Sequence, residues 1–179
     1  FMDGLDQQST ANVRQSLKQL SGGVTIKIQD KPGYLKDIIT AGVSENVKLI
    51  RSIPQEYMDK ISAAVTNSIM SPDGGLGALK ERIMQINGMT ERRAETIAKD
   101  QTSKIYQQMS LERTKAAGVQ KGKWIHSGGG AHPRSRHVEA NGKEFDLSKG
   151  LPIGDNGAWV LPGQEINCRC TWVPIITFG

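Results

Sequence analysis

The sequence has few of the residues that mark several large classes of protein. Its 179 residues include only two cysteines, and three each of Trp, Tyr and Phe. Two cysteines separated by one residue do not make the disulfide framework of a small secreted domain, so a reducing compartment is the simpler expectation. No apolar run approaches the roughly 20 residues of a membrane span, and no signal-peptide pattern opens the chain. We therefore expect no membrane partner.

Charge is also modest. The chain carries 23 Lys and Arg against 18 Asp and Glu, a net charge of +5. This bias permits an acidic or phosphate-bearing partner without requiring one. A hydrophobic content of 37% with 5% aromatic residues predicts a lean core. The length suits one domain, or a helical region with a small second module.

The first two-thirds of the chain predict helices. In residues 1–34, Val13, Leu17 and Leu20 recur at helical spacing and residues 24–28 alternate like a short strand. We interpret residues 1–34 as an arm that orders against a partner. Residues 35–118 form the predicted helical region, with apolar stripes repeating every three to four residues. Its last stripe consists of Ala94, Ile97, Ala98, Ile105 and Met109, with Thr90 as a cap before it and Gly118 as a stop after it.

Residues 119–179 differ in texture, because glycine, proline and tryptophan become frequent and long helical patterns stop. Short strands are predicted at 123–126, 143–147, 159–161 and 170–175, with a short helix between 133 and 140. The predicted fold class is therefore α+β: a helical N-terminal region followed by a small mixed module that has little core of its own.

All three histidines and both cysteines lie in this last module. His132 and His137 are five residues apart, and Cys168 and Cys170 are two apart. Alternate residues of a strand point to the same face, so both sulfurs can reach one ion. Two imidazoles and two thiolates suit tetrahedral zinc, which would staple a module short of core. This pattern predicts a structural zinc site, with His126 as an alternative ligand.

A second interpretation of the same residues stays open. Free cysteines are often buried as small hydrophobic residues, and His137 can be satisfied by backbone carbonyls. Arg134 and Arg169 can pair with nearby acids instead of serving a metal site. These acids are Asp146, Asp155 and Glu165.

Basic residues are scattered over 92–123. The favoured interpretation is a solvated helix face, and the functional alternative is a surface that contacts nucleic-acid phosphates. No aromatic residues alternate with them, so stacking on single-stranded bases is not expected. The candidate nucleic-acid-binding residues are Arg92, Arg93, Lys99, Lys104, Arg113 and Lys115.

Signals of catalysis are weak. No nucleophile elbow, P-loop or dinucleotide fingerprint occurs. A metal-dependent nuclease needs carboxylates for a hard cation, and only Glu139 and Asp146 lie near the histidines. We expect no enzyme, and keep a metal-dependent nuclease or toxin-like effector domain as the alternative.

The motifs of the C-terminal module, in their order and spacing, resemble the phage Mu protein F-like family of minor head (head morphogenesis) proteins. The resemblance extends over about residues 35–179. It is carried by the sequence Arg92-Arg93-Ala94-Glu95-Thr96-Ile97-Ala98, by Pro133-Arg134-x-x-His137-x-x-x-x-Gly142, and by Pro162-Gly163-x-x-Ile166-Asn167-Cys168-Arg169-Cys170.

The resemblance implies a virion component present in few copies, assembled in the host cytoplasm and located in the head interior or at the portal vertex. Its implied partners are the portal protein, capsid proteins and, in some phages, packaged double-stranded DNA. It does not imply catalysis. It also implies that His137, Cys168 and Cys170 form one structural unit, whereas His132 lies where relatives vary, so the fourth metal ligand is the least specified.

Overall fold

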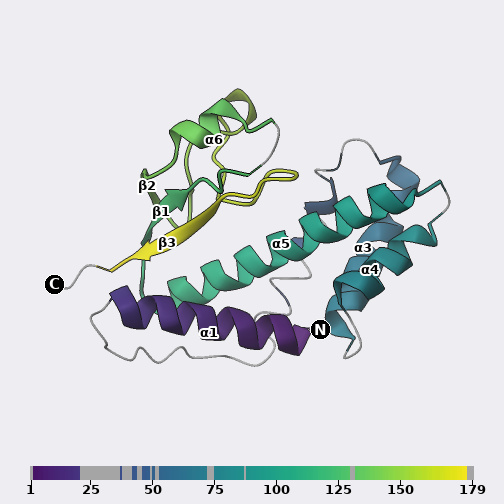
Figure 1. The fold of residues 1–179 in the computed structure, drawn as a ribbon, viewed down its shortest axis with the longest axis horizontal. Coiled ribbons are helices and arrows are strands. Elements are labelled where there is room, and N and C mark those ends of the chain that lie inside the picture. The colour runs from purple at the N-terminus through teal and green to yellow at the C-terminus, as the bar shows by residue number, and fades with distance from the viewer. Residues whose placement is uncertain are drawn as a thin grey trace. The chain divides into compact units, whose positions relative to one another are not determined.

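The fold is α+β, as the sequence predicts. The computed structural model describes residues 2–20, 37, 42–43, 46–48, 50, 53–71, 75–86, 88–129 and 132–176. The predicted strand at 24–28 lies outside them. The chain divides into two compact units, one formed by the described residues of Phe1–Ser9 and Lys31–Met109, the other by those of Thr10–Asp30 and Ser110–Gly179. The described elements are α1 (Met2–Leu20), α3 (Gln55–Met70), α4 (Leu76–Met84), α5 (Glu91–Ala116), β1 (Lys121–Ile125), α6 (Ser135–Glu139), β2 (Glu144–Asp146), the 3-10 turn η1 (Asp155–Gly157) and β3 (Thr171–Ile175) (Figure 1).

The first unit is helical. Its helices α3, α4 and the greater part of α5 each bury one apolar stripe, because residues three and four apart lie on the same helix face. The predicted starting and stopping signals of α5 are also present. The Thr90 hydroxyl accepts a hydrogen bond from the Arg93 N–H at 3.4 Å, and Gly118 has a φ of +86° just beyond the helix end. The buried stripe residues are Ile61, Val65, Ile69, Leu79, Ile83, Ala94, Ile97, Ala98, Ile105 and Met109.

The second unit contains a three-stranded antiparallel sheet in the order β2-β1-β3. The central strand β1 buries Trp124 completely on one face and exposes Lys121 and Lys123 on the other. Pro174 lies opposite Gly122 in the edge strand β3. A residue without an N–H is tolerated on an edge strand and hinders pairing with a further strand.

The core of this second unit draws on segments far apart in the sequence. Val13 and Leu17 of α1 pack in the same hydrophobic cluster as Leu111 of α5, Trp124 of β1 and Phe145 of β2. The second half of α1 therefore supplies apolar surface that residues 119–179 lack, and it is part of this unit's core.

Two local features differ from the sequence pattern. Leu20 has the helical spacing of Val13 and Leu17, which are buried, but it is 47% exposed. The segment 159–161 was expected to be a strand, but it forms only an isolated bridge between Leu151 and Val160. Within the described residues, no helix combines the length and apolar character needed to cross a membrane.

Candidate metal centre

His137 is carried by α6, which is fastened to the central strand. The Trp124 N–H donates to the Lys143 carbonyl, and the Gly142 N–H donates to the Trp124 carbonyl, both at 2.8 Å. Gly142 has a φ of +82°, which glycine adopts without strain. These bonds place the imidazole ring of His137 edge-on to the Trp124 indole, with ring centroids 5.4 Å apart. The predicted motif glycine therefore helps to position the histidine.

The two cysteines lie just before β3, after a tight turn. The Cys168 N–H donates to the Glu165 carbonyl at 3.0 Å, and Asn167 within this turn has a φ of +56°. Asparagine is one of the few residues other than glycine that adopts this conformation readily. The turn brings both sulfurs close to His137 of α6. Asn167 therefore has a conformational role in the motif.

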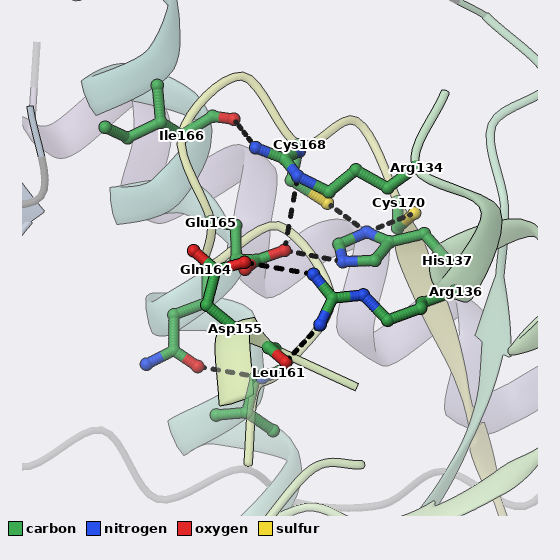
Figure 2. Close-up of polar contacts among 11 residues, drawn as sticks. Arg134, Arg136, His137, Asp155, Leu161, Gln164, Glu165, Ile166, Cys168 and Cys170 are labelled. Carbon is green, nitrogen blue, oxygen red and sulfur yellow. Dashed lines mark hydrogen bonds and ion pairs between the residues drawn. The ribbon is translucent and has the colours of Figure 1, made fainter. Parts of the chain in front are cut away.

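The structure brings His137, Cys168 and Cys170 together in one buried group. Nδ1 of His137 lies 3.3 Å from the Cys168 sulfur and 3.6 Å from the Cys170 sulfur (Figure 2). The three residues are 3%, 7% and 3% exposed. Their ligand atoms all lie within 4.8 Å of one another, so the group could hold a metal ion. One imidazole nitrogen and two sulfurs form a soft donor set, which suits zinc better than magnesium or calcium.

The pKa values of the two thiols are shifted in opposite directions. The pKa of Cys168 is lowered to about 5, chiefly because the Cys170 side chain hydrogen-bonds to its thiolate; the N–H groups of Cys170 and Gly163 and the nearby His137 act in the same direction. The pKa of Cys170 is raised, first by its bond to Cys168 and then by burial. The hydrogen bond between the two side chains therefore favours ionisation of Cys168 over Cys170, and a cation can take the place of a thiol proton.

A carboxylate lies on the other side of the imidazole ring. Oε2 of Glu165 is 2.6 Å from Nε2 of His137, and Figure 2 shows the two sulfurs and this carboxylate at opposite edges of the ring. Sequence reasoning treated Glu165 only as a partner for an arginine. Its place three residues before Cys168, inside the turn that carries the cysteines, was the available signal.

The remaining histidines do not belong to this group. His132 is exposed. Nδ1 of His126 accepts a hydrogen bond from the Gly128 N–H at 3.1 Å, and its own backbone N–H donates to Asn141 at 2.9 Å. Three of the four predicted ligands are thus brought together, and neither His132 nor the alternative ligand His126 is among them.

The arginines of the motif differ in their roles. Arg134, which follows Pro133, donates to the Ile166 carbonyl at 3.1 Å, and its Nε lies 3.6 Å from the Glu165 carboxylate. Arg169 is exposed. Arg136, which was not singled out from the sequence, pairs with Asp155 at 3.0 Å and donates to the Gly154 carbonyl. Arg134 and Arg136 therefore connect α6 and the residue before it to two parts of the following chain, at Ile166 and at Gly154 and Asp155.

Most of the candidate nucleic-acid-binding residues are buried or form ion pairs along α5. Lys104 and Arg113 are buried, at 4% and 2% exposed, so they do not form the expected solvated face. Lys104 pairs with Asp100 at 2.9 Å, Lys99 with Glu95 at 2.6 Å and Lys115 with Glu112 at 3.0 Å. Arg92 is exposed and Arg93 is half-buried. The pattern of basic residues in this stretch reflects ion pairing along α5 at least as much as an open basic surface.

Residues 59–173 match the family model described as phage Mu protein F like protein. The chain belongs to the phage Mu protein F-like family. The matched segment contains His137, Cys168 and Cys170, and membership confirms the resemblance found in the sequence motifs.

Two curated relatives are similar to this family member. An uncharacterized protein of Haemophilus influenzae is 31% identical over 180 residues, which cover 98% of this chain and 38% of that protein. The NAD(+)–arginine ADP-ribosyltransferase EFV of Enterococcus faecalis is 26% identical over 155 residues, which cover 80% of this chain and 31% of that protein. The chain thus spans about a third of the length of each of these relatives. No solved structure matches it.

Proposed function

We propose that this chain is part of a minor head protein of a Mu-like phage or prophage, with a structural role in head assembly and DNA packaging at or near the portal. The observation that carries the proposal is the family match over residues 59–173. It includes the whole buried His/Cys group, so the feature with the most specific chemistry lies inside the region shared by the family. The proposed partners are the portal and capsid proteins, contacted through helical faces.

The buried group is proposed to hold a structural zinc ion. Its soft donors converge within 4.8 Å, and all three donor residues are buried. A metal here would join α6 to the segment that leads into β3, two elements 31 residues apart at their nearest ligands. Cross-linking of this kind contributes folding free energy to a small module. His132 completes the predicted ligand set, and its exposed position means that it would have to move to do so.

We further propose that the chain performs no catalysis. Burial of all three donors leaves little access for a substrate at this group. A nuclease that uses Mg²⁺ needs oxygen ligands, whereas Glu165, the carboxylate nearest the group, faces Nε2 of His137 and not the sulfurs. The transferase activity in the name of one relative belongs to a protein of which only 31% is matched, so it supports no activity here.

Contact with packaged DNA would be non-specific and weak if it occurs through α5. The chain has a net charge of +5, but three of the six candidate residues form ion pairs. DNA binding that depends on a few exposed residues such as Arg92 should fall only gradually with salt, because the salt dependence scales with the number of phosphates contacted.

The experiment is genetic and structural. The coding sequence is deleted from the phage or prophage and complemented with the unaltered protein, with a Cys168→Ser, Cys170→Ser double variant, or with Glu139→Gln, an exposed change on α6. We expect the protein in purified virions at low copy number. We also expect the deletion and the double variant to reduce DNA-filled heads and titre, with Glu139→Gln unaffected.

Two results would contradict the proposed assembly role. A protein absent from virions, with full titre after deletion, would contradict the assembly role. Cleavage of DNA by the purified protein with added divalent metal, lost on His137→Ala, would establish the nuclease alternative instead.

A further inference from the structure

Two charged side chains lie on the side of the His137 ring that faces away from the two sulfurs. Glu165 contacts the ring nitrogen of His137 that faces away from the sulfurs, at 2.6 Å. Arg134 approaches the same carboxylate oxygen at 3.6 Å. Figure 2 shows these three side chains in sequence, from arginine to carboxylate to imidazole, with the two sulfurs beyond the ring. The three side chains therefore extend from the partly exposed Arg134 inward to the buried His/Cys group.

The contact with Glu165 determines which nitrogen of His137 carries a hydrogen. A carboxylate accepts hydrogen bonds and does not donate them, so the close contact with Glu165 requires the hydrogen of a neutral His137 to be on Nε2. Its lone pair is then on Nδ1, the nitrogen 3.3 Å and 3.6 Å from the two sulfurs. An imidazole binds a metal through such a lone pair. Glu165 thus selects the tautomer that is competent as a ligand, and cannot itself bind the same ion.

The two atoms in this contact are buried. Neither Nε2 of His137 nor Oε2 of Glu165 has a hydrogen-bond partner of standard geometry in the described part of the chain; the close polar contact they make is with each other, at 2.6 Å. Burying two such atoms apart from each other would be costly. Each atom is therefore the nearest polar partner of the other, which favours a hydrogen on Nε2 that points at the carboxylate.

The Glu165 carboxylate is itself held in place by Arg134 and by the turn that precedes Cys168. The Arg134 guanidinium contacts Glu165 and donates to the Ile166 carbonyl, the next residue in the turn. The Glu165 carbonyl accepts the Cys168 N–H at 3.0 Å. Glu165 therefore contacts His137 through its side chain and stabilises the turn before Cys168 through its backbone carbonyl. One residue thus helps to position both the histidine and the first cysteine.

We propose that Glu165 is a positioning residue that holds His137 as an Nδ1 metal ligand, and that Arg134 supports it. This inference rests on the proposed zinc site and deepens it. Partners of this kind, which hydrogen-bond the far nitrogen of a ligating histidine, typically contribute roughly 10- to 100-fold to metal affinity.

The test measures zinc affinity by competition with a chromophoric chelator for the unaltered chain, Glu165→Ala and Glu165→Gln. Glu139→Gln, which removes an exposed charge from α6, is the matched control. We expect roughly 10- to 100-fold weaker binding for Glu165→Ala and a smaller loss for Glu165→Gln, whose amide oxygen still accepts a hydrogen bond. Glu139→Gln should not change the affinity. The isosteric glutamine variant keeps the test valid if the alanine variant fails to fold.

A purely structural role is separated by a second readout. Nitrogen-15 spectra of the zinc-loaded protein report the tautomer of His137: Nε2–H with metal on Nδ1 in the unaltered chain, and a mixture of the two tautomers in Glu165→Ala. Unchanged affinity, or an unchanged tautomer despite a lower melting temperature, would overturn the positioning role alone. Absence of zinc binding by the unaltered chain would overturn the zinc site and this inference together.

Discussion

Replacing Gly150 by alanine should be among the most damaging small changes in the second unit. Gly150 has a φ of +81°, and its N–H donates to the Asp146 carbonyl at 2.8 Å. A Cβ at this position would lie 2.1 Å from the Val160 carbonyl oxygen and 2.5 Å from its carbon. Both are backbone atoms, so no side-chain rotation relieves the clash.

The magnitude follows from two separable costs. A left-handed conformation costs an alanine about 1–2 kcal/mol. The clash also forces Val160 away from Leu151, with which it exchanges two hydrogen bonds at 2.9 Å. Losing both would cost about 1–3 kcal/mol more, since each contributes roughly 0.5–1.5 kcal/mol. We therefore expect Gly150→Ala to lower the free energy of unfolding by about 2–5 kcal/mol.

Gly142→Ala is the matched control. Gly142 has nearly the same φ, +82°, but an added Cβ there would meet nothing within 4 Å. It should show the conformational cost alone, about 1–2 kcal/mol. Chemical denaturation of both variants under identical conditions provides the comparison. If Gly150→Ala were no more destabilising than Gly142→Ala, the close approach of Val160 to Gly150 would be refuted.

Two further predictions concern packing and protons. Leu17→Ala should lower the free energy of unfolding, measured by chemical denaturation, by about 2–5 kcal/mol, because Leu17 is completely buried. Leu20→Ala, at a 47% exposed position, should change it by less than about 0.5 kcal/mol. Equal effects of the two substitutions would contradict the packing of α1. Zinc binding at pH 7 should release about one proton, since the lowered pKa of Cys168, about 5, leaves it ionised while the raised pKa of Cys170 keeps it protonated. Calorimetry in buffers of different ionisation enthalpy measures this number, and release of about two protons would contradict the opposite shifts of the two pKa values.

The helices of the first unit were predictable because burial repeats with the period of the helix. The stripe from Ala94 to Met109 is buried as expected, and local signals at Thr90 and Gly118 marked the ends of α5. His137, Cys168 and Cys170 were predictable as a group because few other residue types bind soft metals, and because the family motif keeps their spacing.

What the sequence could not indicate depends on contacts between distant segments. Nothing in the spacing of Val13 and Leu17 says that they pack with Trp124, more than 100 residues away. The role of Glu165 arises only from its place behind His137. Lys104 was assigned to a solvated face because lysine is seldom buried, but Asp100, one turn earlier, pairs with it.

The most direct test of the account is the metal content of the purified chain, measured together with its thermal melt before and after a chelator. The account predicts about one zinc per chain and a melting temperature that falls on chelation, as for other structural zinc sites. The same treatment should have no effect on the Cys168→Ser, Cys170→Ser variant, which should bind no zinc. A metal-free protein whose melt is indifferent to chelator would contradict the central claim that His137, Cys168 and Cys170 staple this unit.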